Sequence, residues 1–290
     1  MRLFIRLGLC LLVLKWLIGG SIASGLYAQG PAPPGTVDRS ATVTDAEREA
    51  HLARMKEIAS SIRLLSDARK PDSEVKLIET PVLRYSDQTR RAHESALWVW
   101  SAGGRPSAVL AIEFYPTRPR ETSWLYEIAS LSTERIGARS GDGLNWSARE
   151  PGLTFQPLEG AGEPADKPTR RLTQLREIHR RFTAHEQTPN EGRIELRPLT
   201  SPLVRYTDAD RDVLDGAVLA FANGTNPEVL LVLEARTRPD PPGVWQYALV
   251  QLSGAEVTAE LDGVAIWKHD EADPPAVRES YVNGWLSGRP

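Results

Sequence analysis

The sequence predicts an α+β fold of two tandem repeats, each with one long helix followed by a four- to five-stranded antiparallel meander. Residues 81–132 align with residues 202–253 at a constant offset of 121, and 14 of the 52 aligned pairs are identical. Helical spacing of apolar residues precedes each aligned segment, and period-two alternation with tight turns fills it. We expect the repeats to span residues 44–150 and 166–272, with a linker at 151–165 and a C-terminal tail at 273–290.

The first 28 residues have the pattern of a secretory signal peptide. Arg2 and Arg6 precede an apolar run over residues 7–22, which ends in small residues. The alternative is an uncleaved membrane anchor, which needs about 20 apolar residues, although Lys15 interrupts this run. Residues 29–43 are rich in proline and predict a disordered linker. The expected location is therefore periplasmic or extracellular.

Apolar residues recur at steps of three and four at the start of each expected repeat, which places them on one face of a helix. They are Leu52, Met55, Ile58, Ile62 and Leu65 in the first repeat, and Leu172, Leu175, Ile178 and Phe182 in the second. We expect Thr44 or Asp45 to cap the first helix, and Asp166 or Thr169 to cap the second.

Alternating apolar and polar residues between turn residues predict five strands in each repeat. Their expected ranges are 76–85, 95–101, 107–115, 123–136 and 143–149, and then 197–206, 216–222, 228–236, 244–252 and 264–269. Ala102-Gly103-Gly104 and Asn223-Gly224 occupy matching positions and predict hairpins. Such tight turns require antiparallel strands, because a parallel crossover needs a dozen or more residues.

The mature chain is expected to be acidic and without cysteine. Removal of the signal takes the basic count from 35 to 32, against 38 acidic residues, and removes Cys10. Nucleic-acid binding requires a basic surface, so we expect no nucleic acid as partner. Without disulfides the stability must come from burial of a core, for which about 245 residues are ample. We expect no cofactor, and no stable membrane span after signal cleavage.

The aligned segments share the run Pro-x-x-Arg-Tyr-Ser/Thr-Asp and a Trp-x-Tyr strand. With these motifs, the duplicated segment resembles uncharacterised exported proteins of planctomycete-type bacteria over most of the mature chain. The resemblance implies a bacterial extracytoplasmic setting. It brings no known activity or catalytic residue with it.

A glutamate interrupts an otherwise apolar strand at the same place in both repeats, as Glu113 and Glu234. A buried carboxylate needs a partner. Arg84 and Arg205 also align with each other, so we expect structural ion pairs Arg84–Glu113 and Arg205–Glu234. The alternative is that Glu113 or Glu234, working with a nearby acid, serves as general acid or base of a hydrolase acting on a polysaccharide or cell-envelope substrate. Because both repeats keep the same residues and catalytic sites are usually asymmetric, the structural interpretation is favoured.

Two aromatic residues on one face of a strand also align between the repeats. Trp124 and Tyr126 correspond to Trp245 and Tyr247. These four rings are the candidate ligand-facing aromatics, since paired rings could build a platform for a sugar, and core packing is the alternative.

The candidate metal ligands are Asp208, Asp210 and Asp212, which have the alternating carboxylates of a calcium loop. The EF-hand pattern also needs glycine at its sixth position and glutamate at its twelfth, where this chain has Val213 and Leu219. The alternative is a capped helical turn with acids near its positive end.

The mature sequence has no nucleophile elbow and no phosphate-binding glycine loop. We therefore expect an exported non-catalytic binding or structural protein of unknown ligand, with a polysaccharide or envelope component as candidate partner. A hydrolase using Glu113 or Glu234 with a nearby acid is the first alternative, and a calcium-binding module is the second.

Overall fold

The computed structural model describes residues 44–87, 92–116, 123–141, 143–189, 191–237, 243–271 and 274–286. All of them belong to one compact unit, Val43–Pro290. The expected signal peptide and proline-rich linker lie outside the described residues.

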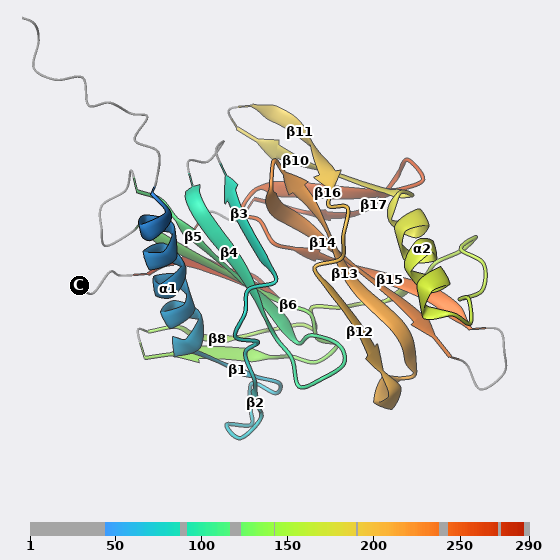
Figure 1. The fold of residues 1–290 in the computed structure, drawn as a ribbon, viewed down its shortest axis with the longest axis horizontal. Coiled ribbons are helices and arrows are strands. Elements are labelled where there is room, and N and C mark those ends of the chain that lie inside the picture. The colour runs from blue at the N-terminus through green and yellow to red at the C-terminus, as the bar shows by residue number, and fades with distance from the viewer. Residues whose placement is uncertain are drawn as a thin grey trace, which may run out of the picture. The chain divides into compact units, whose positions relative to one another are not determined.

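Three antiparallel sheets and two α-helices make up the described fold (Figure 1). The helices are α1 (Asp45–Ser61) and α2 (Pro168–His179). The four-stranded sheet has the order β2 (Glu74–Val75), β1 (Ile62–Leu65), β7 (Gly137–Ser140) and β8 (Asn145–Ser147). The six-stranded sheet has the order β18 (Ala276–Val277), β19 (Tyr281–Leu286), β6 (Trp124–Ser130), β5 (Ala108–Phe114), β4 (Ala92–Trp100) and β3 (Leu83–Asp87). The nine-stranded sheet has the order β17 (Val264–His269), β16 (Glu256–Leu261), β10 (Phe182–Thr188), β11 (Gly192–Pro198), β13 (Val213–Asn223), β14 (Asn226–Arg236), β15 (Val244–Gln251) and β9 (Gln156–Pro157), with β12 (Val204–Asp208) also paired to β13.

The expected fold class, two helix-plus-meander repeats, is wrong. The described residues are mostly β, with 50% of them in strands and 14% in helices. The apolar residues that seemed to continue the helices belong to strands: Ile62 and Leu65 lie in β1, which pairs with β7, and Phe182 begins β10, which pairs with β16. Pairing with strands distant in the sequence overrides the helical spacing at these three positions. The expected antiparallel pairing is confirmed.

Two short segments that were expected to lie outside the sheets contribute strands to them. β9, in the expected linker, pairs with β15 at Gln246 and Tyr247. β19, in the expected tail, pairs with β6 along its whole length. The sheets are therefore completed by segments from the middle and the end of the chain.

Helix α1 begins as the sequence predicts. Thr44 is the N-cap: its Oγ1 accepts from the backbone N–H of Glu47 at 3.2 Å, and Glu47 Oε2 accepts from the backbone N–H of Thr44 at 2.8 Å. This capping box satisfies two N–H groups that a helix start leaves without partners. Helix α2 begins differently, with Lys167 as N-cap and Pro168 as its first residue. Neither Asp166 nor Thr169 caps it.

Three of the four apolar clusters in the described residues hold these layers together. One lies between α1 and the four- and six-stranded sheets and contains Met55, Trp98 and Trp100. Another lies under α2 and contains Phe221 and Trp245. The third joins the six-stranded sheet, through residues such as Leu97 and Val109, to the facing side of β13 and β14 in the nine-stranded sheet. Since this last core draws on both halves of the chain, the two halves fold as one unit.

His179, at the end of α2, makes the stability of the fold depend on pH. Burial, and then the charge of Arg180, lower its pKa from 6.5 to about 4. The ring packs against Phe221 with centroids 4.8 Å apart, and its Nε2 has no hydrogen-bond partner among the described residues. The folded state therefore holds the neutral imidazole, and protonation favours the unfolded state.

We expect His179→Leu to flatten the pH dependence of stability. In the wild type, the contribution of His179 is present above about pH 6.5, the unfolded value, and is lost as the pH falls to about 4. The size of this loss is roughly 3 kcal/mol. Urea unfolding of both proteins at pH 7 and pH 4.5 measures the difference. Equal losses in both proteins would show that other groups cause the acid sensitivity.

Candidate functional site

Glu234 on β14 is fully buried and forms an ion pair that connects the two halves of the chain. Arg105, from the β4–β5 hairpin, donates from Nε to Oε1 at 2.7 Å and from Nη2 to Oε2 at 3.0 Å. Tyr206 donates its hydroxyl to Oε1 at 2.9 Å, and Gln246 donates to Oε2 at 2.9 Å. The guanidinium also lies 4.9 Å from the ring centre of Phe155. Each carboxylate oxygen of Glu234 therefore accepts two hydrogen bonds.

The pKa shifts of Arg105 and Tyr206 agree with these hydrogen bonds. Burial alone would lower the pKa of Arg105, but its hydrogen bonds and charge interaction with Glu234 raise that pKa above the ordinary value. Burial, and then the charge of Glu234, raise the pKa of Tyr206. Tyr206 therefore keeps its proton and acts as a donor.

The expected partners of the two aligned glutamates are corrected by the structure. Arg205 pairs with Asp215 at 2.6 Å rather than with Glu234. Arg84 lies at the surface and pairs with Glu49 of α1 at 3.6 Å. The arginines point to the helices because their strands, β3 and β12, turn these side chains away from the face that carries the glutamates.

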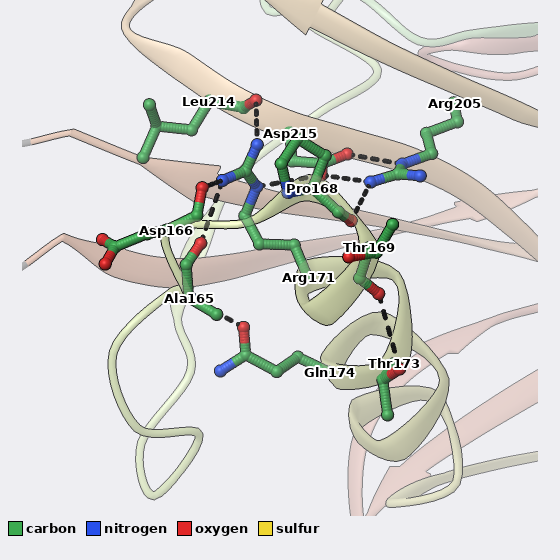
Figure 2. Close-up of polar contacts among 10 residues, drawn as sticks. All are labelled: Ala165, Asp166, Pro168, Thr169, Arg171, Thr173, Gln174, Arg205, Leu214 and Asp215. Carbon is green, nitrogen blue, oxygen red and sulfur yellow. Dashed lines mark hydrogen bonds and ion pairs between the residues drawn. The ribbon is translucent and has the colours of Figure 1, made fainter.

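Asp215 on β13 is the centre of the network that Arg205 joins (Figure 2). Arg171 of α2 donates from Nε to Asp215 Oδ2 at 3.0 Å, and Arg205 donates from Nε to Oδ1 at 2.8 Å. Arg171 also donates to the carbonyls of Ala165 and Asp166, at 2.9 and 2.8 Å. This network fixes the start of α2 on the sheet. At the offset-related position, Glu94 lies 2.8 Å from His51 Nδ1 of α1.

Glu113 on β5 is buried like Glu234, but its described partners are two phenols. Tyr85 donates to Oε1 at 3.0 Å, and Tyr115 donates to Oε2 at 2.5 Å. Tyr85 corresponds to Tyr206 at the offset of 121, so a Tyr–Glu hydrogen bond is present at both places. The arginine that pairs with Glu234, Arg105, corresponds to Asn226 at the offset of 121. Asn226 lies near Glu113, so an asparagine stands where the other glutamate has an arginine.

Glu113 opens onto a cavity of about 390 Å³, which we call the acidic cavity. Its walls come from β5 and β6 on one side, from β10, β14 and the segment after β15 on another, and from Glu271, Pro274 and Trp285. The polar and aromatic lining residues are Glu113, Glu127, Glu186, Glu191, Glu228, Glu271, Asn226, Thr188, Ser253, Tyr115 and Trp285. The cavity therefore combines carboxylates with aromatic rings.

Four of these glutamates are buried and take part in hydrogen bonds. Besides Glu113, Glu127 accepts from the hydroxyl of Tyr281, Glu186 accepts from Asn223 Nδ2 at 2.7 Å, and Glu228 accepts from Asn226 Nδ2 at 2.9 Å. Such bonds hold each carboxylate in one orientation at the cavity wall.

The phenols beside these glutamates are strongly perturbed. Burial, and then the charge of Glu113, raise the pKa of Tyr85 well above its ordinary value. Burial, and then the charge of Glu127, do the same for Tyr281. Both phenols therefore stay protonated and act as donors to the carboxylates.

The four candidate ligand-facing aromatics do not meet in one groove. Trp245 is buried in the core under α2. Tyr247 packs edge-on against Phe182, with ring centres 5.1 Å apart, and borders a different cavity. Trp124 and Tyr126 are half-buried and pack against the core under α1. The aromatic wall of the acidic cavity comes instead from Tyr115 and Trp285, whose ring centres are 5.4 Å apart in an edge-to-face arrangement.

The three candidate calcium ligands do not converge. Asp208 is buried, and its Oδ2 accepts from Arg211 at 2.7 Å and from the backbone N–H of Arg105 at 3.2 Å. Burial would raise the pKa of Asp208, but these bonds lower it. Asp210 and Asp212 are exposed on a 3₁₀ turn and its end. In the described ranges, no group of three or more acidic, histidine or cysteine side chains could hold a metal ion.

The geometry also separates the two glutamates of the hydrolase hypothesis. Glu113 borders the acidic cavity, whereas Glu234 is enclosed by Arg105, Tyr206 and Gln246 and does not line that cavity. A glycosidase needs two carboxyl groups about 5–9.5 Å apart across one cleft. These two residues therefore do not form such a pair.

Three glutamates of the cavity, Glu127, Glu186 and Glu228, were not identified from the sequence. Their offset-related residues are Ala248, Leu65 and Ser107, so they are absent from the aligned identities. A polar residue within an apolar strand, as at Glu127 and Glu228, is the feature that could have identified two of them.

Comparisons with family models, with curated proteins and with solved structures found no match to this chain. The resemblance to exported planctomycete-type proteins therefore stays an expectation. Among the helices that the structure describes, none is long and apolar enough to cross a membrane.

Proposed function

We propose that this chain is an exported, non-catalytic binding protein whose acidic cavity holds a small sugar. The observation that carries the proposal is the cavity itself, which brings oriented carboxylates and two aromatic rings together from distant parts of the chain. Its volume of about 390 Å³ lies within the usual range for small-molecule sites, about 300–1,000 Å³.

The lining suits a ligand that is rich in hydrogen-bond donors. The oxygens of a carboxylate accept hydrogen bonds, and each sugar hydroxyl can donate one. Tyr115 and Trp285 supply an apolar wall for the C–H face of a sugar ring. Neutral sugars and small amines share the donor chemistry, so both classes belong in the test.

The separation of Glu113 from Glu234 argues against a hydrolase that uses these two residues as its pair, and hydrolysis by Glu113 with another glutamate of the cavity is tested by the release of reducing ends. Of this pair, only Glu113 lines the cavity, and Glu234 is engaged by Arg105. We therefore expect polysaccharide incubated with the protein to release no new reducing ends.

Sugar binding is expected to raise the melting temperature. A ligand present at 100 times its Kd stabilises the folded state by about 2.7 kcal/mol, or ~5–10 °C for a domain of this size. The measurement is a thermal melt with glucose, N-acetylglucosamine, cellobiose and the diamine putrescine. A shift with putrescine alone would refute the sugar assignment, and no shift with any of the four would contradict binding in this cavity.

Two variants locate the site. Trp285→Ala removes part of the aromatic wall, so the sugar-dependent shift should fall by more than half. Trp267→Ala is the matched control, because Trp267 is a half-buried tryptophan that lines the other cavity. Equal effects of the two substitutions would place the sugar elsewhere.

Export is the second part of the proposal and rests on the signal-like pattern of residues 1–28. Expression in a Gram-negative host should give protein in the periplasmic fraction, with an N-terminus near residue 29. N-terminal sequencing of that fraction is the measurement. Full-length protein retained in the cytoplasm would contradict export.

A further inference from the structure

Two hairpins related by the offset of 121 each reach from one half of the chain to the other. The β4–β5 hairpin carries Arg105-Pro106-Ser107, and the β13–β14 hairpin carries Asn226-Pro227-Glu228 at the corresponding positions. Arg105 lies against Glu234 of the second half, and Asn226 lines the same cavity as Glu113 of the first half. We call these two places the arginine crossing and the asparagine crossing.

Each hairpin is attached to the opposite half by backbone hydrogen bonds. At the arginine crossing, the N–H of Arg105 donates to Asp208 Oδ2 of β12 at 3.2 Å. At the asparagine crossing, Thr225 Oγ1 donates to the carbonyl of Ser86 in β3 at 2.8 Å and accepts from the N–H of Ser86 at 3.2 Å. Strands β3 and β12 are themselves related by the offset of 121. The two hairpins are therefore held at corresponding places.

The two crossings also share a glutamate and a tyrosine. Tyr206 donates its hydroxyl to Glu234 at 2.9 Å, and Tyr85 donates its hydroxyl to Glu113 at 3.0 Å. All four residues are buried. Both crossings therefore have the same buried hydrogen bond on the strand side, and they differ in what the hairpin brings to it.

The arginine crossing is filled by its own side chain. Arg105 is buried, its guanidinium donates to both oxygens of Glu234 at 2.7 and 3.0 Å, and it lies over the ring of Phe155. Asn226 has a much shorter side chain, and the acidic cavity of about 390 Å³ opens beside Asn226 and Glu113. A long cation thus accompanies the closed crossing, and a short amide accompanies the open one.

A second exchange on the hairpin accompanies the first. Asn226 is buried, and its Nδ2 donates to Glu228 Oε1 at 2.9 Å. At the arginine crossing, the residue that corresponds to Glu228 is Ser107, which has no carboxylate. The bond to Glu228 holds the amide of Asn226 at the wall of the cavity.

We propose that Asn226 keeps the acidic cavity open to its ligand, and that the ligand lies beside Glu113 in the place that the guanidinium of Arg105 occupies beside Glu234. The inference rests on the proposed function, because the ligand is the sugar assigned to this cavity. One duplicated contact has then taken two roles. Arg105 closes its crossing as a structural ion pair, and Asn226 determines that the other crossing binds.

Asn226→Arg places the arginine of the closed crossing in the open one. We expect it to reduce the sugar-dependent rise in melting temperature by at least about three quarters. Asn226→Ala leaves the cavity open and should keep at least about half of that rise. Gln156→Arg is the charge-matched control, because Gln156 is exposed and lines the second cavity, which Tyr247 borders. Its sugar-dependent rise should equal that of the wild type.

A second measurement needs no ligand. If the two crossings correspond, an arginine at position 226 interacts with Glu113 as Arg105 does with Glu234. We expect Glu113→Gln to lower the folding equilibrium constant at least about tenfold more in the Asn226→Arg background than in the wild type. Urea unfolding of the four proteins at pH 7 gives this double-mutant cycle.

The outcomes separate this proposal from the proposed function. A full sugar-dependent rise in Asn226→Arg, equal losses in Asn226→Arg and Asn226→Ala, or no coupling between positions 226 and 113 would each overturn the role of Asn226. Coupling without any sugar-dependent rise in the wild type would refute the proposed function and support the correspondence of the crossings. If Asn226→Arg does not fold, Asn226→Met fills the cavity without a charge and should lose the rise as well.

Discussion

Arg105→Ala is expected to destabilise the fold by about 3–5 kcal/mol, because it leaves the carboxylate of Glu234 buried without its cation. Glu234 is fully buried, and the guanidinium supplies two of its hydrogen bonds, at 2.7 and 3.0 Å. The same side chain connects the β4–β5 hairpin to β14, so its loss also weakens the contact between the halves of the chain. Urea unfolding at pH 7 measures the loss of free energy, and a thermal melt should show a fall in melting temperature of ~6–20 °C.

Arg63→Ala is the matched control for this substitution. Arg63 forms an ion pair with Glu74 of the same short length, 2.7 Å, but both side chains are at least half exposed. An exposed pair contributes about 0–1 kcal/mol. Similar losses in the two variants would show that burial of the Arg105–Glu234 pair has no special weight.

Asp215→Ala is expected to have a comparable effect, about 3–5 kcal/mol, because two guanidinium groups then lose their shared carboxylate. Arg171 is buried as well, so its charge cannot move to solvent without displacing the start of α2. We therefore expect a local effect in addition to the global one. Amide hydrogen exchange across residues 165–171 should accelerate more than exchange in α1.

Asp262→Ala provides the control for Asp215. Asp262 also accepts from an arginine, Arg181, at 2.6 Å, but on the surface. Its loss should change stability little and leave exchange at the start of α2 unaltered. If Asp215→Ala unfolds the protein fully, Asp215→Asn keeps the shape with a neutral amide and allows the local exchange to be measured.

Local structure was predicted best where adjacent residues decide it. The Thr44 cap, the hairpin at Asn223-Gly224 and the strand at residues 264–269 all follow from short sequence patterns, and the structure has each of them. The boundaries at Ile62 and Phe182 were missed because an apolar residue at the end of a helical pattern can equally begin a buried strand.

The partners of the buried charges could not be predicted from aligned positions. The search for pairs present in both halves favoured Arg84 and Arg205, whereas the residue that reaches Glu234 is Arg105, which aligns with Asn226. A contact made once, between the halves, leaves no repeated pattern. The acidic cavity was missed for the same reason, since three of its buried glutamates have no acidic counterpart at the offset of 121.

β9 and β19 pair with the edges of β15 and β6, although the composition of both segments is typical of loops. β9 has two residues, and β19 follows a proline-containing loop. β9 is too short for alternation to distinguish it from a loop, and the apolar and polar residues of β19 do not alternate. Their pairing with β15 and β6 is decided by the edges that those strands offer.

The most direct test of a binding role is an NMR titration of the labelled protein with the sugar that gives the largest thermal shift. The account predicts saturable chemical-shift changes at the indole N–H of Trp285 and at the amides of Gly254 and Ala255, which line the acidic cavity, with the indole N–H of Trp267 unchanged. Unchanged spectra, or changes confined to Trp267 and the edge of β15, would contradict it.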